Sequence, residues 1–560
     1  MLFSISLLLS LGLVVNATPA PLEDAKLGAV ASESAVCSQI GIDMLQCGGN
    51  AADALVATQL CVGVIGMYHS GIGGGGFMLI RSQNGSYDFI DFRETAPAAA
   101  FQDMFAPEFA GTTASLYGGL ASGVPGELRG LEYLHFNYGN LPWSKLVMPS
   151  VKLAREGFRV TEDLVRYMNG VKNPYNFFVN EATWALDFAP NGTLVGLGDT
   201  MTRKRYADTL EIIAEHGPDA YYSGAIANTT VLALQASNGT MTLEDMASYT
   251  IAKRPSSNIT YRGYKIHSGS SPSGGPVVLS ALKIVEGFDM SSPSNLNLST
   301  HYLDEAMRFA YGQRTLLGDP TFDTNLTDYQ HNMVSENIAA EIRSKISDTN
   351  TLEPKEYNPN GYSILDDKGT SAAVAADNSG LTIACTSTIN TIFGSRVMIP
   401  ETGVIMNNEM NDFSIPNATN AFGYIPTEAN FIRPGKRPLS SISPSIVEYP
   451  DGRVYISHAS AGGSRIITEV IQHLWHTLDQ NMTSAEALAE PRFHNQLSPN
   501  TASFEYSYNN ATTSFLSSLG VNVTFTVPGG STAQSIRILP NGTFEAAGEP
   551  RQLNSAGYAI

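Results

Sequence analysis

Residues 366–414 read DDKGTSAAVAADNSGLTIACTSTINTIFGSRVMIPETGVIMNNEMNDFS, and this stretch decides the fold. Residues 370–376 are small or β-branched, residues 377–380 have the composition of a tight turn, and residues 381–388 return as a second strand. Strands this rich in Ala, Thr, Val and Ser can be covered on both faces. We therefore predict a buried hairpin with Thr370 at its mouth.

Four short motifs lie in or beside this hairpin: Gly369-Thr370, TSTIN at 386–390, FGS at 393–395 and NNEMNDFS at 407–414. Together they resemble the γ-glutamyltranspeptidases (glutathione hydrolases), which are N-terminal nucleophile hydrolases. The resemblance implies an α/β (α+β) fold, a four-layer αββα sandwich formed jointly by two chains cut from one precursor. It also implies that the cut precedes a Thr, which then serves as the nucleophile. Without these motifs, Thr370 would be an ordinary strand residue.

The residue types at the expected cut agree with this chemistry. A Thr hydroxyl is a weak nucleophile and needs a base beside it. If the chain is cut between Gly369 and Thr370, the new α-amino group, with an unperturbed pKa of roughly 7.7–8.0, can be that base. Gly369 has no side chain to obstruct the approach. Residues 347–367 are polar and rich in Pro, Asn and Gly, the composition of a mobile segment before a cut.

A second group of motifs concerns the substrate. DFRETAP at 91–97 resembles the arginine loop of the family, and RPLSSISPS at 437–445 resembles its serine pair. The resemblance implies that Arg93, Ser440 and Ser441 hold the α-carboxylate of a γ-glutamyl group. A guanidinium suits this task because its planar fork can bind a carboxylate through two hydrogen bonds. By itself, Arg93 would be interpreted as a surface arginine.

The other end of the γ-glutamyl head group carries an α-ammonium. The resemblance implies that Asn390, Glu409 and Asp412 receive it, because carboxylate and amide oxygens can accept its charge-assisted hydrogen bonds.

AGGS at 461–464 completes the resemblance. It implies that the backbone N–H groups of Gly462 and Gly463 stabilise the tetrahedral oxyanion. Thr388 lies on the returning strand, where it can hydrogen-bond the hydroxyl of Thr370.

The implied reaction is ping-pong. Thr370 attacks the γ-glutamyl amide, releases Cys-Gly from glutathione, and passes the glutamyl group to water or to an amino acid or peptide acceptor. No metal and no organic cofactor is required. The expected partners are these small molecules and the two subunits of the chain itself. Two alternatives remain, a related acylase acting on another amide and an unprocessed secreted binding protein.

Composition limits the classes of function. The 560 residues include 33 Lys and Arg against 52 Asp and Glu, a net charge of −19. This acidity argues against a nucleic-acid partner. With 43% hydrophobic and 15% charged residues, the chain has a globular composition and is long enough for a large core.

Residues 2–15 are apolar and uncharged, a length that suits a signal peptide and is short for a membrane span. Ala17 and Ala20 offer cleavage sites, and an uncleaved anchor is the alternative. We therefore expect a signal peptide at 1–20, a large subunit at 21–369 and a small catalytic subunit at 370–560, with no stable membrane anchor.

Glycosylation sequons are dense in this chain, which supports a secretory route with surface glycans and an extracellular or vacuolar location. They lie at Asn84, Asn191, Asn228, Asn238, Asn258, Asn297, Asn325, Asn417, Asn481, Asn510, Asn522 and Asn541.

The four cysteines do not make a disulfide scaffold in so long a chain. The family resemblance implies a disulfide between Cys37 and Cys61, which joins two helices near the N-terminus. Cys47 and Cys385 are predicted to be buried thiols.

GIGGGG at 71–76 matches a dinucleotide-binding fingerprint. However, we expect helices at 33–46 and 51–65, the second capped by Asn50, and a strand at 77–81. A helix therefore precedes the glycines and a strand follows them, the reverse of the order in a Rossmann fold. We reject NAD binding and expect the glycines to allow close backbone packing.

Two other patterns are interpreted as structural. Ser280-x-x-Lys283 copies a serine β-lactamase signature without its partner motifs. His473-x-x-His476 lacks the Glu and the spacing of a zinc-binding helix. Residues 414–436 form a long segment rich in Pro, Asn and Ala, a composition typical of a functional lid.

Overall fold

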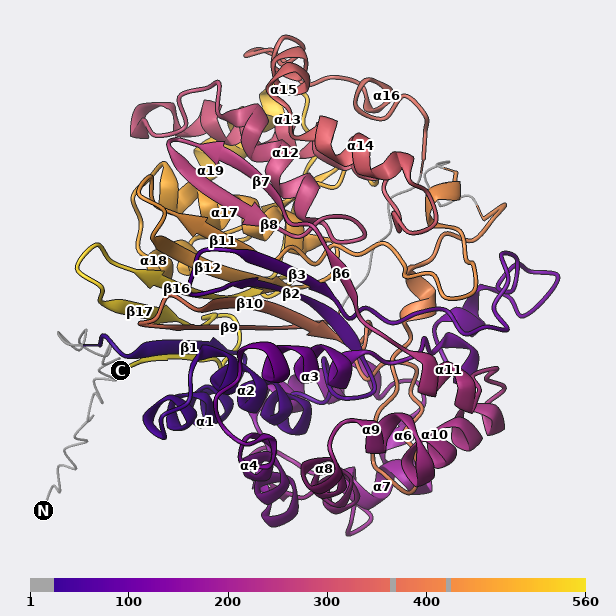
Figure 1. Cartoon of the computed structure of the whole chain (residues 1–560). Helices are drawn as coiled ribbons and strands as arrows, with labels where there is room; N and C mark the ends of the chain where they lie inside the picture. Colours follow the sequence, from indigo (N-terminus) through magenta and orange to yellow (C-terminus); the bar gives the residue numbers. More distant parts are fainter. Residues whose placement is uncertain (1–24, 363–368, 419–424) are drawn as a thin grey trace, which may run out of the picture.

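The computed structural model describes residues 25–362, 369–418 and 425–560. The chain forms a seven-stranded sheet and a six-stranded sheet. Figure 1 shows the two sheets stacked between two layers of helices. This is the predicted αββα sandwich. The predicted signal peptide lies outside the described residues, and so do residues 363–368 before the expected cut and residues 419–424 of the predicted lid.

The first sheet has the strand order β18-β1-β9-β10-β2-β3-β6, and all neighbouring strands are antiparallel. Its strands are β1 (Gly28–Ser32), β2 (Gly75–Arg81), β3 (Tyr87–Asp91), β6 (Ala252–Arg254), β9 (Ser371–Asp377), β10 (Thr382–Thr388) and β18 (Ala556–Ala559). β1 precedes the expected cut, yet it lies between β9 and β18, which follow it. The two expected subunits therefore share one sheet.

The second sheet has the order β17-β16-β12-β11-β8-β7 and is also antiparallel. Its strands are β7 (Ser257–Tyr261), β8 (Tyr264–Ser268), β11 (Ser445–Glu448), β12 (Val454–Ala461), β16 (Thr532–Ile538) and β17 (Phe544–Ala547). The described residues also form two small sheets, from β4 (Phe158–Arg159) and β5 (Thr200–Met201), and from β13 (Phe493–His494), β14 (Ala502–Glu505) and β15 (Val523–Thr526).

The helices form the two outer layers (Figure 1). Those on the side of the first sheet are α1 (Ala35–Gln46), α2 (Ala51–Ile65), α3 (Glu127–Tyr138), α4 (Trp143–Glu156), α5 (Glu162–Val171), α6 (Phe177–Asn180), α7 (Ala182–Phe188), α8 (Lys204–His216), α9 (Asp219–Tyr222), α10 (Gly224–Ala236) and α11 (Leu243–Ser248). Those on the side of the second sheet are α12 (Gly275–Val285), α13 (Leu296–Arg314), α14 (Asn325–Met333), α15 (Glu336–Arg343), α16 (Pro354–Tyr357), α17 (Arg465–Leu478), α18 (Ser484–Ala489) and α19 (Asn510–Ser518).

The central hairpin is buried on both faces, as predicted. Ala373 and Ala375 of β9 belong to the core shared with α1 and α2. Ala372, Val374 and Ala376 belong to the core shared with the second sheet. Because successive side chains of a strand point to opposite faces, the alanines on both faces of β9 let both layers approach it closely.

The turn of this hairpin also supports α2. Gly380 has φ +90°, a conformation that favours glycine. Asp377 accepts hydrogen bonds from the Ser379 N–H at 2.8 Å and, across the fold, from the Ala51 N–H at 2.8 Å. Asn50 caps the same helix in a capping box. The predicted N-cap is therefore confirmed.

The glycine run has the packing role that the order of elements predicts. It follows α2 and leads into β2, which pairs with β10. A side chain at Gly74 would clash with the carbonyl oxygen of Thr388, and one at Gly76 with that of Thr386. These glycines let β2 lie directly against the strand that carries Thr388.

The predicted disulfide is present, and it joins Cys37 of α1 to Cys61 of α2 with their Cα atoms 5.3 Å apart. Cys385 is a buried free thiol in β10, as expected. The prediction that Cys47 is buried is wrong. Cys47 follows the last turn of α1, where the chain leaves the helix for Gly48 and Gly49, and its side chain is exposed.

Candidate active site

Thr370 and Thr388 meet at the open end of the β9–β10 hairpin. Ser371 pairs with Ser387 in antiparallel register, so the residues just outside this pair are also opposite each other. The two hydroxyl oxygens of Thr370 and Thr388 lie 3.4 Å apart. The structure thus brings together the predicted nucleophile and its predicted hydrogen-bond partner.

The carbonyl oxygen of Gly369 accepts hydrogen bonds from both hydroxyls. The Thr388 Oγ1 atom lies 2.8 Å from this oxygen, and the Thr370 hydroxyl contacts it as well. Gly369 has φ +121°, and a Cβ there would lie 2.5 Å from the carbonyl oxygen of Asn390. Both facts require glycine at the residue before Thr370.

Gly462 and Gly463 follow the end of β12, with φ of +128° and +60°. Neither backbone N–H donates a hydrogen bond to another residue in the described part of the chain. Gly462 lines the same cavity as Thr370, whereas Gly463 does not. Gly462, one of the two predicted oxyanion donors, therefore shares a cavity with the predicted nucleophile and has a backbone N–H available to a ligand.

A cavity of about 460 Å³ opens at Thr370, a volume typical of small-molecule sites. Gly369, Thr370 and Gly462 line one part of it. The rest is lined by residues that sequence reasoning had not selected, including Arg166, Arg465 and His494.

Three of the predicted head-group residues, Arg93, Glu409 and Asp412, form a buried ion cluster. Arg93 follows β3, and its guanidinium contacts the carboxylates of both Glu409 and Asp412, which lie on one 3₁₀ turn (Glu409–Asp412). Burial, and then the negative charge of Glu409, raise the pKa of Asp412 to about 7, although Arg93 opposes this. Two carboxylates around one guanidinium leave one excess negative charge when both are ionised.

The other predicted head-group residues lie in two places. Asn390 connects the hairpin to the ion cluster, because its N–H donates to the Thr388 hydroxyl at 2.7 Å and its side chain donates to the Asn408 carbonyl at 3.0 Å. Ser440 and Ser441 belong to another buried segment. No head-group residue lines the cavity at Thr370.

Sequence reasoning missed Arg314, which donates a hydrogen bond to the Ser441 hydroxyl at 3.0 Å and is only 2% exposed. It follows the buried Met307 and Tyr311 at helical spacing on α13. A charged residue at a position that continues the apolar face of a helix is therefore a sequence signal that could have identified Arg314.

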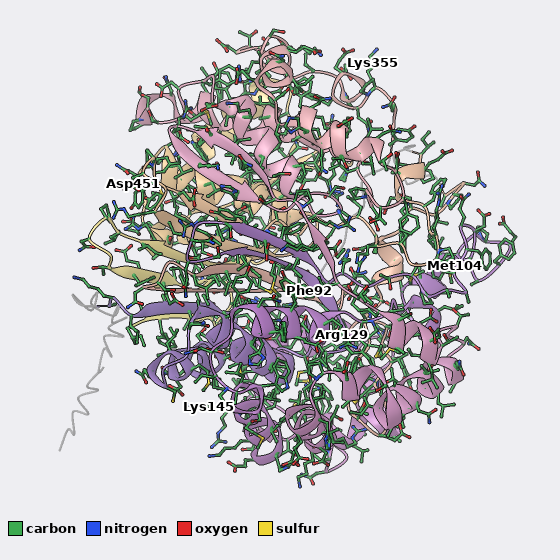
Figure 2. The ribbon with its side chains drawn as sticks, viewed as in Figure 1. Phe92, Met104, Arg129, Lys145, Lys355 and Asp451 are labelled. Carbon is green, nitrogen blue, oxygen red and sulfur yellow. A yellow bond between two sulfur atoms is a disulfide. The ribbon has the colours of Figure 1, made fainter. Side chains whose placement is uncertain are left out.

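The arginine loop is held by a second ion cluster around Asp91. Asp91 accepts from the Arg93 N–H at 3.0 Å and pairs with Arg254 at 2.6 Å and Arg437 at 3.3 Å. Phe92, which is fully buried, anchors the loop in the middle of the molecule (Figure 2). These contacts explain how Arg93 is positioned.

The predicted lid contacts the ion cluster. In the described part of residues 414–436, the Asn430 side chain donates to the Asp412 carbonyl at 2.7 Å and accepts from the Leu439 N–H at 2.9 Å. Lys436 donates to the Ala429 carbonyl at 2.8 Å. The function of this segment as a lid stays a prediction.

Two buried carboxyl groups lie behind the hairpin. Burial raises the pKa of Glu94 to about 8, although the charge of Arg93 opposes the shift. Burial also raises the pKa of Glu127 to about 8, although a hydrogen bond from Ser387 opposes it. Each group has a higher pKa in the folded protein than in the unfolded chain, so the folded state binds more protons.

This difference predicts a pH-dependent stability. The stabilisation of the folded state by these protonated groups is complete below about pH 4.5, the ordinary pKa of a Glu. It is lost as the pH rises through about 8. Glu127→Gln keeps an acceptor for Ser387 but cannot ionise. The free energy of unfolding should therefore fall less steeply with rising pH, by up to about 1.4 kcal/mol per pH unit.

The measurement is denaturant unfolding between pH 5 and 8 in an uncut Thr370→Ala background, which keeps one chain. Glu156→Gln, at a side chain that is 66% exposed, is the matched control and should leave the slope unchanged. A Glu127→Gln protein with the parental slope would show that this carboxyl does not carry the effect.

One cluster has the residue types of a metal site. Ligand atoms of His458, Glu469 and His473 lie within 4.8 Å of one another. However, Glu469 already accepts from His458 at 2.8 Å and lies 3.5 Å from the Arg492 guanidinium, a competing cation. His476 instead contacts Gln480 at 2.8 Å. The arrangement fits a buried ion-pair network, in agreement with the structural interpretation of the two helix histidines.

The sequence and the fold are both similar to those of known proteins. A γ-glutamyltranspeptidase family model matches residues 37–559. A glutathione hydrolase proenzyme from Arthroderma benhamiae is 53% identical, covering 97% of this chain and 94% of that protein. A glutathione hydrolase from Aspergillus flavus is 49% identical, covering 96% of this chain and 90% of that protein. A cephalosporin acylase from Bacillus halodurans shares the fold, with a TM-score of 0.82 at 24% identity, covering 98% of this chain and 99% of that one.

Proposed function

The chain belongs to the γ-glutamyltranspeptidase family, and from this membership we propose that it is a glutathione hydrolase activated by cleavage between Gly369 and Thr370. One observation carries the proposal. The hydroxyls of Thr370 and Thr388 both contact the Gly369 carbonyl oxygen, at the edge of a cavity large enough for a small substrate.

The first step is cleavage of the chain itself. The Thr370 hydroxyl attacks the carbonyl carbon of Gly369, the C–N bond breaks, and the proton passes to the departing nitrogen, which leaves an ester. Thr388 donates to the carbonyl oxygen, where negative charge develops. Water then hydrolyses the ester, which releases the carboxylate of Gly369 and restores the hydroxyl of Thr370, whose α-amino group is already free.

The mature enzyme repeats this chemistry on a substrate. The α-amino group of Thr370 takes the hydroxyl proton, the oxygen attacks the γ-glutamyl carbonyl, and the leaving amine departs with a proton. Gly462 and Gly463 offer N–H groups to the oxyanion. Water or an amino acid or peptide acceptor then takes the glutamyl group from the ester, and Thr370 regains its proton.

The buried ion cluster is proposed to recognise the γ-glutamyl head group. The excess negative charge of Glu409 and Asp412 suits the α-ammonium, with Asn390 beside them. Arg93 and the pair Ser440 and Ser441 suit the α-carboxylate. An acylase that acts on other amides would not need a site that binds both an ammonium and a carboxylate at the same end of its substrate.

The two products of the cut are proposed to stay together as a heterodimer of residues 21–369 and 370–560, because both sheets contain strands from each part. A secretory route is also proposed. Every predicted glycosylation site except Asn297 is exposed, as a glycan requires. Among the described residues, no helix has the length and apolarity needed to cross a membrane.

One preparation of the purified protein tests the function. It should give two fragments on a denaturing gel, with Thr370 at the N-terminus of the smaller, and should hydrolyse γ-glutamyl-p-nitroanilide and glutathione. A protein that is fully cut but releases no product from either donor would contradict the proposed activity. An active protein that remains one chain would contradict the cleavage.

A further inference from the structure

The cavity at Thr370 is basic although the chain is strongly acidic. The net charge of the protein is −19. Among the described residues that line the cavity there are two arginines, Arg166 and Arg465, and no Asp or Glu. A lining of this kind is unexpected for an acidic chain unless the cavity receives an anion.

Arg465 is the arginine whose charge is free to act on a ligand. Its half-buried guanidinium makes no ion pair or hydrogen bond with any other residue that the structure describes. Arg166, by contrast, lies 3.6 Å from Asp163, donates to the Tyr167 hydroxyl at 2.6 Å and is 42% exposed. The two residues therefore form a natural pair for comparison.

Arg465 is held close to the oxyanion donors. It is the first residue of α17, and its backbone N–H donates to the Gly462 carbonyl at 3.3 Å. The neighbouring His494 adds no positive charge, because burial, and then the charge of Arg465, lower its pKa to about 3. Arg465 is thus the cation that faces this side of the cavity.

We propose that Arg465 binds the C-terminal carboxylate of the group on the amine side of the scissile bond. That group is Cys-Gly when glutathione is cleaved, and an amino acid or peptide when it is the acceptor. The inference rests on the proposed function and specifies the second half of the same site. The γ-glutamyl head group uses the buried ion cluster, whose residues lie outside the cavity lining, so the cavity is left for the amine side.

The volume of the cavity agrees with this assignment. Two extended residues span about 7 Å, so the glycine carboxylate of glutathione lies about that far beyond the scissile nitrogen. A cavity of about 460 Å³ accommodates a dipeptide of this length. A guanidinium binds such a terminal carboxylate through two charge-assisted hydrogen bonds.

The test compares two donors that differ only in this charge, glutathione and its C-terminal amide. The kcat/KM ratio of glutathione to the amide should exceed one in the normal enzyme. In Arg465→Gln the ratio should fall roughly 10- to 100-fold, the value of a hydrogen bond to a charged group. Arg465→Lys should recover part of the ratio. Arg166→Gln should change kcat/KM for both donors by the same factor and leave the ratio unchanged. Glycylglycine and its amide, used as acceptors, should show the same pattern.

The outcomes separate the inference from the function on which it rests. Equal losses for both donors in Arg465→Gln, or no preference for glutathione in the normal enzyme, would overturn the carboxylate site while leaving the hydrolase intact. A normal enzyme that is cut at Thr370 yet inactive on γ-glutamyl-p-nitroanilide would overturn the proposed function instead. Cleavage of each variant into two fragments reports that it has folded.

Discussion

Thr370→Ala should give a single uncut chain with no measurable release of product from γ-glutamyl donors. The substitution removes the oxygen that contacts the Gly369 carbonyl and that would form the ester. Loss of a nucleophile typically lowers turnover by several orders of magnitude, and we expect a loss of at least about 10³-fold in kcat/KM. Electrophoresis measures the cut, and p-nitroaniline release measures the turnover.

Two variants show whether this effect belongs to the hydroxyl. Thr370→Ser keeps the oxygen and should still be cut, more slowly. Thr388→Val keeps the shape of Thr388 but removes the donor 2.8 Å from the Gly369 carbonyl oxygen, so cleavage should slow by about 10²-fold and still finish. A Thr370→Ala protein that is cut at the same bond would rule out Thr370 as the nucleophile of processing.

Asp412→Asn should lower kcat/KM for γ-glutamyl donors by about 10²–10³-fold while cleavage of the chain survives. The substitution keeps the shape of the side chain but removes a buried charge that the α-ammonium would need. Removal of one partner from a buried charge pair costs roughly 3–5 kcal/mol. The same charge should make donor binding weaken as the pH falls below about 7, where Asp412 becomes protonated, and Asp412→Asn should lose this dependence.

A donor without the α-amino group provides the control. It should be poor with the normal enzyme and should lose little more with Asp412→Asn. Arg93→Lys, which keeps a charge but loses the planar fork, should weaken the binding of γ-glutamyl donors in the same assay. If Asp412→Asn reduces kcat/KM equally for both donors, Asp412 is a structural partner of Arg93 and does not bind the ammonium.

The effects of Thr370→Ala and Asp412→Asn can be measured separately because the two residues lie in different parts of the site. Arg93, Glu409 and Asp412 are buried and lie outside the cavity lining, whereas Thr370 lies at the cavity edge. Changes in the cluster should therefore act on the recognition of the head group, and changes at Thr370 on the bond-making step.

Local sequence was sufficient for the elements that carry the site. The hairpin of β9 and β10, the cap at Asn50 and the packing role of the glycine run follow from residue size, turn composition and element order. These properties act over a few residues, so they are present in the sequence itself. The motifs around Thr370 identified the family, which implied the sandwich and the Cys37–Cys61 disulfide.

Tertiary structure alone decided which distant groups meet. Arg314 donates a hydrogen bond to Ser441, Arg437 pairs with Asp91, and Arg465 lines the cavity at Thr370. The raised pKa of Glu127 likewise depends on burial by the packed layers, and the exposure of Cys47 on how the chain leaves α1. Charge pairing and desolvation depend on separations in space between segments that are far apart along the chain, and no local pattern records those separations.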